Sequence, residues 1–140
     1  DNRPGPEHMA AEKFGRLLDA ATHLADHMAE APALIFACLK ERPLPPSLAP
    51  RLARLAGSSI YPAVQNILLT CRALGIGATL TTVASLYEAD LKKVLGLPDD
   101  VNTYALIPIG YPLGKFGPVN RLPVEEVTCL DQWGSSFKKP

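Results

Sequence analysis

Two short runs of the sequence are apolar at all or most positions, and they limit the folds open to the chain. The runs are Ala33 to Leu39 and Tyr104 to Ile109, and each has the length of a strand. Because neither alternates apolar with polar residues, both predict strands that are covered on both faces. Pro108 indicates that the second strand ends or bulges there, since proline donates no ladder hydrogen bond.

Amphipathic segments flank these two strands. Apolar residues recur every three or four positions from Glu7 to Glu30, which predicts a helix with one polar face. A second helix is expected over Ser58 to Leu74, and its wide apolar stripe predicts burial on most sides. Ser58 or Ser59 is its expected N-cap, and Gly75 its left-handed C-terminal residue.

Shorter signals complete the pattern. Ser85-Leu86-Tyr87-Glu88 matches a capping box and predicts a short helix that ends at Gly96. The proline-rich stretch from Lys40 to Ala56 is typical of a long surface excursion, and Val124 to Leu130 is a weak strand candidate. Helices and covered strands predict a layered arrangement in one domain over 1–140. Two confident strands are too few for a stable sheet, so further strands must come from an absent part of the chain or from a partner subunit.

Composition excludes several function classes. Lys plus Arg and Asp plus Glu number 14 each, so no overall charge favours nucleic acid or an anionic membrane. The longest apolar stretch is far shorter than the roughly 20 residues that span a bilayer. Cys38, Cys71 and Cys129 are widely spaced in apolar contexts, which predicts buried free thiols of a cytoplasmic protein.

One pair of histidines could be read as part of a metal site. His23 and His27 lie four residues apart on a helix face that also carries Asp19 and Asp26. A solvated polar face is the alternative, because the sequence offers no second cluster of ligands, and we expect no bound metal.

The segment from Gly75 to Leu80 begins like a dinucleotide-binding fingerprint. It lacks the third glycine and follows a helix instead of a strand. It therefore does not fit a Rossmann fold, in which the motif follows a strand and begins a helix. Two readings remain. The segment is either a helix C-cap with a tight turn, or a stretch of uncrowded backbone, including Thr81 and Thr82, that a flat ligand can approach.

Two cations flank a later loop that is stiffened by glycine and proline. Lys115 and Arg121 could clamp a phosphate, with Arg121 offering a planar fork and Lys115 a point charge. Exposed solubilising charges are the alternative. No carboxylate pair or nucleophile–base arrangement can be assembled, so an enzyme of this sequence would rely on a cofactor.

Three segments, in order, resemble the nitroreductase family over roughly residues 10 to 133. The first is Ser58-Ser59-Ile60-Tyr61-Pro62-Ala63-Val64-Gln65-Asn66-Ile67-Leu68-Leu69, which leads into Ala73-Leu74-Gly75-Ile76-Gly77. The second is Thr79-Leu80-Thr81-Thr82 with the later Val94-Leu95-Gly96-Leu97-Pro98. The third is Leu106-Ile107-Pro108-Ile109-Gly110-Tyr111-Pro112 with Arg121-Leu122-Pro123 and Glu125-Glu126-Val127.

The resemblance implies an α+β fold, a three-layer α/β/α sandwich with a mixed central sheet, here without its N-terminal part. It implies a homodimer that binds FMN at the subunit interface and passes hydride from NAD(P)H to nitro-aromatic, quinone or similar small-molecule acceptors. Carried over by position, Leu80, Thr81, Thr82 and Val83 face the flavin ring. Arg121, and less directly Lys115, would contact its phosphate, and 124–140 would form an arm over the partner subunit.

The chain departs from the family pattern in two places. The family's basic N-terminal phosphate motif does not occur in it, and Thr82 stands where the family has an acidic residue. The fragment as written should therefore hold FMN weakly, and the main chain would have to do the work of the missing acidic side chain. A non-catalytic flavin-binding homologue is the first alternative, and a helical interaction module with an accidental resemblance is the second.

Overall fold

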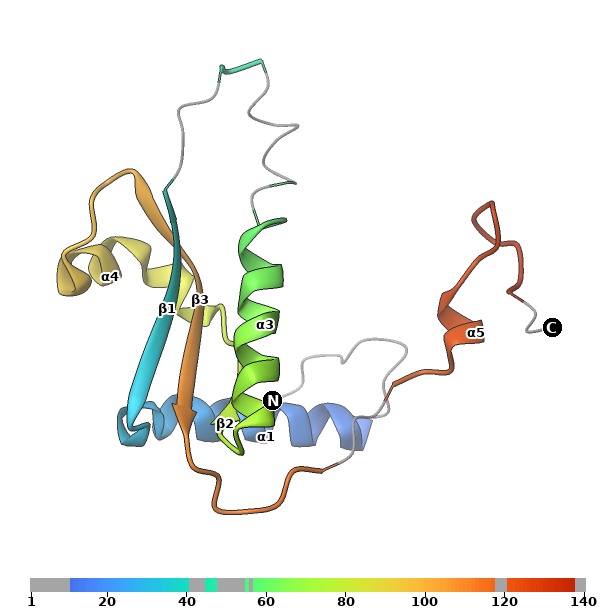
Figure 1. Cartoon of the computed structure of the whole chain (residues 1–140), viewed down its shortest axis with the longest axis horizontal. Helices are drawn as coiled ribbons and strands as arrows, with labels where there is room; N and C mark the ends of the chain where they lie inside the picture. Colours follow the sequence, from blue (N-terminus) through green and yellow to red (C-terminus); the bar gives the residue numbers. More distant parts are fainter. Residues whose placement is uncertain (1–10, 41–44, 48–54, 56, 118–120, 138–140) are drawn as a thin grey trace.

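The structure is a computed structural model that describes residues 11–40, 45–47, 55, 57–117 and 121–137 (Figure 1). Most of the surface excursion expected over Lys40 to Ala56 therefore lies outside the described residues. In chain order the elements are α1 (Ala11–Asp26), the 3-10 helix η1 (Met28–Glu30), β1 (Ala33–Lys40), α3 (Ile60–Ala73), β2 (Gly77–Ala78), the 3-10 helix η3 (Val83–Tyr87), α4 (Glu88–Leu95), β3 (Val101–Gly110) and α5 (Val124–Val127).

Strand β3 is the centre of a three-stranded sheet of order β1-β3-β2. Both pairings are antiparallel, so the expected parallel pairing of a mixed sheet does not occur among the described strands. Ala37 lies opposite Ala105 whereas Cys38 lies opposite Thr103, which makes Tyr104 the extra residue of a bulge. The strand was expected to end or to bulge at Pro108, which instead lies inside the ladder.

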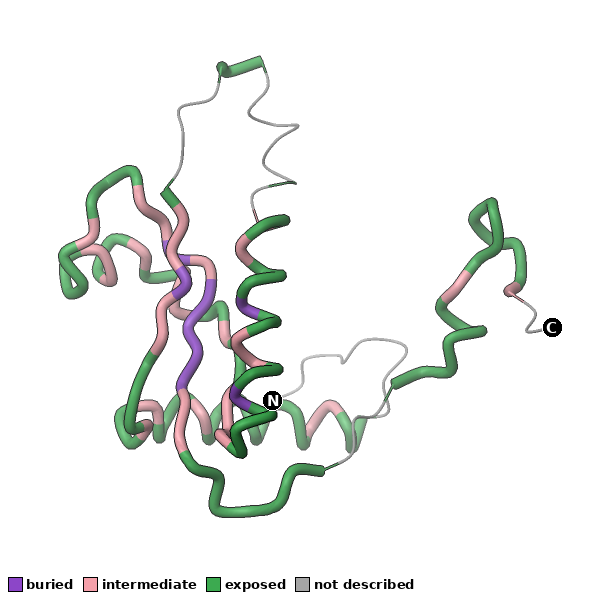
Figure 2. The backbone as a smooth tube through the Cα atoms, viewed as in Figure 1, coloured by how far each residue is buried: buried purple, intermediate pink, exposed green. Residues whose placement is uncertain are grey.

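Helix α3 packs on one face of the sheet and forms the core with it. Val64 of α3 meets Ala37, Ala105 and Ile107, and Ile107 is completely buried. Ala105 and Ile107 point to this face because side chains of a strand alternate between its two faces. Figure 2 shows that burial is concentrated on β3 and on one side of α3.

Two predictions overestimated how much of an element is buried. Only Val64 and Cys71 of α3 are buried, and Leu69 is 57% exposed, because a three-stranded sheet covers only one side of the helix. In β1, Leu34 remains 41% exposed, so only β3 fulfils the expectation of a strand covered on both faces.

Helix α1 crosses the opposite face of the sheet. Its apolar stripe faces Leu106, whose neighbour Ile107 points to the α3 face. The order α3, sheet, α1 gives three layers, as expected for an α+β sandwich of this kind (Figure 1). No residue of α1 is buried, so this third layer is held loosely.

The C-terminus of α3 is fixed by a Schellman motif, as Gly75 predicted. Gly75 has φ +74°, the amide of Ile76 donates to the carbonyl of Cys71 at 2.8 Å, and the amide of Gly75 donates to Arg72 at 3.2 Å. The predicted N-cap is wrong in detail: Ser59 makes no side-chain capping bond, and the Ser58 hydroxyl donates to the carbonyl of Leu55.

The expected capping box at the start of α4 is replaced by a contact with β3. The Glu88 carboxylate accepts hydrogen bonds from the Thr103 amide, at 2.9 Å, and from the Thr103 hydroxyl. The Ser85 hydroxyl donates to the carbonyl of Thr103 instead of to the helix. Glu88 therefore accepts hydrogen bonds from a residue of β3 instead of capping its own helix. Thr103 is buried, so its amide and hydroxyl need an acceptor.

Two further expectations about the C-terminal region and the thiols are wrong. Val124–Val127 is a short helix instead of a strand, in accord with acidic residues in its first turn and Pro123 just before it. Of the three free cysteines only Cys71 is buried, and Cys129 is exposed. Burial and the nearby Glu88 carboxylate raise the pKa of the Cys38 thiol above its usual value.

The Glu88–Thr103 contact predicts a measurable loss of stability in Glu88→Ala. The substitution leaves a buried amide and hydroxyl without an acceptor, so the free energy of unfolding should fall by about 1–3 kcal/mol. Urea denaturation measures the loss.

Asp90→Ala is the matched control, because it also removes a carboxylate of α4. Asp90 only pairs with Lys93 on the surface at 3.2 Å, and its loss should cost less than about 1 kcal/mol. Equal losses in the two variants would contradict the structural role of Glu88.

Candidate functional site

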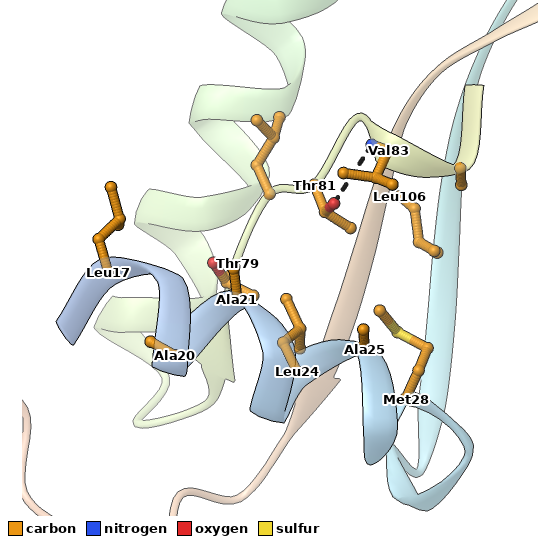
Figure 3. A pocket seen from close by; sticks show the side chains of 12 residues that line it. Leu17, Ala20, Ala21, Leu24, Ala25, Met28, Thr79, Thr81, Val83 and Leu106 are labelled. Carbon is orange, nitrogen blue, oxygen red and sulfur yellow. Dashed lines mark hydrogen bonds between the residues drawn. The ribbon is translucent and has the colours of Figure 1, made fainter. Parts of the chain in front are cut away.

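A groove of about 490 Å³ separates α1 from the sheet (Figure 3). One wall is the apolar stripe of α1, and the other is the segment that follows β2 together with one residue of β3. The lining residues are Leu17, Ala20, Ala21, Leu24 and Ala25 of α1, Met28 of η1, and Thr79, Leu80, Thr81, Val83, Ala84 and Leu106 opposite them. The walls are therefore mainly apolar, and none of these described lining residues is charged.

The width of the groove follows from the composition of α1. Three of the five α1 residues that line it are alanines, Ala20, Ala21 and Ala25, whose short side chains leave the helix backbone close to the groove. Leu17 and Met28 lie toward opposite ends of this wall, with Leu24 between them (Figure 3). The sequence indicated an amphipathic stripe here but not a site, and the alanines within that stripe were the available signal.

The sheet register determines which main-chain groups face away from β3. Thr81 and Leu106 exchange two hydrogen bonds of 2.9 Å, in line with the β2–β3 ladder, in which Gly77 pairs with Gly110. Because successive residues of a strand direct their amide and carbonyl groups to opposite sides, those of Leu80 point away from β3, at the open edge of the sheet. Neither group of Leu80 has a hydrogen-bond partner among the described residues.

The turn into η3 holds the other predicted ring-facing residues. The Val83 amide donates to the Thr81 hydroxyl at 3.4 Å, and the Ser85 amide donates to the carbonyl of Thr82 at 3.0 Å. Thr81 and Val83 line the groove with Leu80, whereas Thr82 does not. The structure thus brings together three of the four residues that sequence similarity assigned to a flat ligand.

The two phosphate candidates lie elsewhere. Lys115 and Arg121 are both exposed, and neither lines the groove. Beside Lys115, the Phe116 ring lies 3.7 Å from the Arg72 guanidinium, which attaches this loop to the end of α3. From Arg121 onward the described chain leads away from the sheet and α3 (Figure 1).

The histidine pair of α1 is not part of a larger cluster. The rings of His23 and His27 lie 4.0 Å apart, and Nδ1 of His27 is 2.9 Å from the carbonyl oxygen of His23. Across the described ranges, no three His, Cys, Asp or Glu side chains converge on a point where they could hold a metal ion.

The model of the nitroreductase family matches residues 2–111 of the sequence. The chain belongs to the nitroreductase family. A protein of Methanothermobacter thermautotrophicus, provisionally assigned as an NADH dehydrogenase/NAD(P)H nitroreductase, is 38% identical over 73 residues, which cover 51% of this chain and 38% of that protein.

Solved structures of nitroreductases share the fold. An FMN- and NADPH-dependent nitroreductase, NfnB, from Sphigopyxis sp. strain HMH was solved as a single-residue variant. It superposes with a TM-score of 0.60 at 21% identity, over 91% of this chain and 54% of that chain. A protein of Parabacteroides distasonis, provisionally assigned like the archaeal one, gives 0.52 at 23% identity, over 95% of this chain and 90% of that chain.

The chain therefore spans only part of the proteins it matches first, 38% of the archaeal protein and 54% of NfnB. The nitroreductase-like α+β fold inferred from the three sequence segments is confirmed by these matches. None of the helices in the described part is long and apolar enough to cross a membrane.

Proposed function

We propose that the full-length protein is an FMN-dependent oxidoreductase that passes hydride from NAD(P)H to nitro-aromatic, quinone or similar electron-poor acceptors. The observation that carries the proposal is the apolar groove between α1 and the sheet, with the main chain of Leu80 at its edge. Family membership supports the same class of chemistry.

The groove fits the ring part of the cofactor. Its volume of about 490 Å³ falls in the range of ligand pockets, roughly 300–1,000 Å³, and its walls are mainly apolar. The Leu80 amide can donate, and its carbonyl can accept, at the edge of a flat ring that carries both kinds of group. When bound, FMN supplies the hydride chemistry, which no side chain of the groove could perform.

The chain's own contribution is orientation and electrostatics. Thr81 is fixed to Leu106 by two hydrogen bonds, so the neighbouring Leu80 amide is held in place before a ligand arrives. A preorganised amide stabilises negative charge that develops on a neighbouring ring. Ala21 and Leu24 exclude water from the opposite wall. No acidic side chain is needed for this role, which agrees with a threonine at position 82.

The phosphate of FMN requires a second set of groups. Lys115 and Arg121 remain our candidates because their charges match a phosphate, although neither lines the groove of this chain. We therefore propose that a second subunit or residues outside the described ranges complete the phosphate site.

A homodimer would also cover the C-terminal arm, residues 124–140. Its described part exposes large apolar side chains, with Trp133 98% exposed and Val127 64% exposed. Leu69 of α3 adds to the apolar surface that this chain leaves uncovered. Exposed apolar groups in such number are typical of a protein interface. Free thiols fit the reducing cytoplasm, which also supplies NAD(P)H, and cell fractionation tests that location.

Reduction of a bound flavin tests the proposal directly. The purified full-length protein should show a visible flavin absorption band, and NADH or NADPH added without oxygen should bleach it. An acceptor such as a quinone should then restore the band. The same preparation should sediment as a dimer.

Three results would count against the proposal. A protein without a flavin band does not bind the cofactor, and a band that neither nucleotide bleaches identifies a non-catalytic flavin-binding homologue. A protein that carries flavin as a monomer contradicts the shared site.

Filling the groove should block the ring. Ala21→Phe places an aromatic side chain between α1 and Leu106, so the affinity of full-length protein for FMN should fall at least about tenfold. Fluorescence titration with FMN measures the loss. Ala11→Phe makes the same substitution at an exposed α1 position outside the groove and should leave the affinity unchanged. Equal affinities of the two variants would show that FMN does not use this groove.

A further inference from the structure

Pro108 interrupts the ladder that joins β3 to the segment carrying the groove wall. Thr81 pairs with Leu106, and Gly77 pairs with Gly110, so the same register puts Thr79 opposite Pro108. In an antiparallel ladder, pairs that exchange two hydrogen bonds occur at every second residue. Since Thr81 and Leu106 form such a pair, Thr79 and Pro108 occupy the position of the next one.

Only one of the two hydrogen bonds of this pair can form, because proline has no amide hydrogen. The carbonyl of Thr79 therefore lacks its ladder donor, whereas the Thr79 amide still faces the carbonyl of Pro108. The amide and carbonyl of Leu80 point away from β3. Thr79 is thus held to β3 by at most one hydrogen bond, whereas Thr81 is held by two.

Pro108 is buried in the middle of a sheet, where proline is rare, and its ring faces the same side as Leu106. Thr79 contributes both to the groove and to a second, shallower hollow of about 300 Å³ that Pro108 itself lines. The proline thus lies directly behind the part of the wall that faces the ligand.

We propose that Pro108 is a positioning residue that leaves Thr79 loosely attached to β3, and so sets the position of the wall against which the cofactor ring lies. This inference rests on the proposed flavin function. With an amide at position 108, the missing hydrogen bond to the Thr79 carbonyl could form and draw the wall toward β3. The groove would keep its residues but lose its shape.

Pro108→Ala in the full-length protein tests the inference, with Pro98→Ala as its control. Pro98 is exposed and lies in the turn before β3, so the control repeats the same substitution outside the ladder. Amide exchange followed by NMR should show a protected amide at position 108. The thermal midpoint should be at or above that of P98A, because a hydrogen bond is gained.

The flavin measurements should move in the opposite direction. We expect P108A to bind FMN about tenfold more weakly than P98A, which corresponds to about 1.4 kcal/mol, and to shift the absorption maximum of the bound flavin. A proline that was only structural would lower stability and leave the bound spectrum unchanged. P108V, which restores the amide on a strand-favouring residue, repeats the test if P108A does not fold.

Each remaining outcome is decisive. A rapidly exchanging amide at position 108 would overturn the inference, because the ladder would then be open for another reason. A protected amide with unchanged FMN affinity and spectrum would overturn the positioning role and leave the proposed function intact. Wild-type protein that binds no FMN would overturn the proposed function and the inference with it.

Discussion

Strand β3 is hydrogen-bonded on both sides, to β1 along nearly its whole length and to the segment from Gly77 to Thr81 on its other edge. All other described layers take their position from this strand. Ile107 points to α3 and is completely buried, whereas Leu106 points to α1 and lines the groove. The alternation of a single strand thus separates a packed core from a ligand-sized space.

The two faces of the sheet are packed to different degrees, and the less tightly packed face carries the proposed site. On the α3 side, Val64 closes the core against Ala105 and Ile107. On the α1 side, alanines face the sheet across a space that no described side chain fills. An apolar groove of this volume has the character of a ligand pocket. The unpaired main chain of Leu80 at its edge favours an occupant with polar edges and apolar faces.

Sequence patterns predicted the helices and strands well where interactions between neighbouring residues determine them. The apolar run 104–109 and the glycine at position 75 gave β3 and the end of α3 correctly, because strand burial and a left-handed residue leave direct traces in the sequence. Predictions failed where a residue interacts with a partner that is distant in the sequence. Glu88 looked like a helix cap but serves Thr103, fifteen residues away, and Pro108 looked like a strand end but sits within the ladder.

The site was predictable in part for the same reason. Similarity to the family selected Leu80, Thr81 and Val83, which line the groove, because this stretch is continuous in the sequence. The α1 wall was not assigned to the site, since only the folded chain brings Ala21 opposite Thr81. The positions of Lys115 and Arg121 relative to the ring depend on a subunit or residues beyond those described, and they stay a proposal.

The claim on which the account depends is that a flavin ring lies against the main chain of Leu80, between the sheet edge and α1. Hydrogen exchange at single-amide resolution, on full-length protein with and without FMN, tests it most directly. The account predicts that FMN slows exchange of the Leu80 amide, while the Thr81 amide, already bonded to Leu106, changes little. An unchanged Leu80 amide in protein saturated with FMN would contradict it.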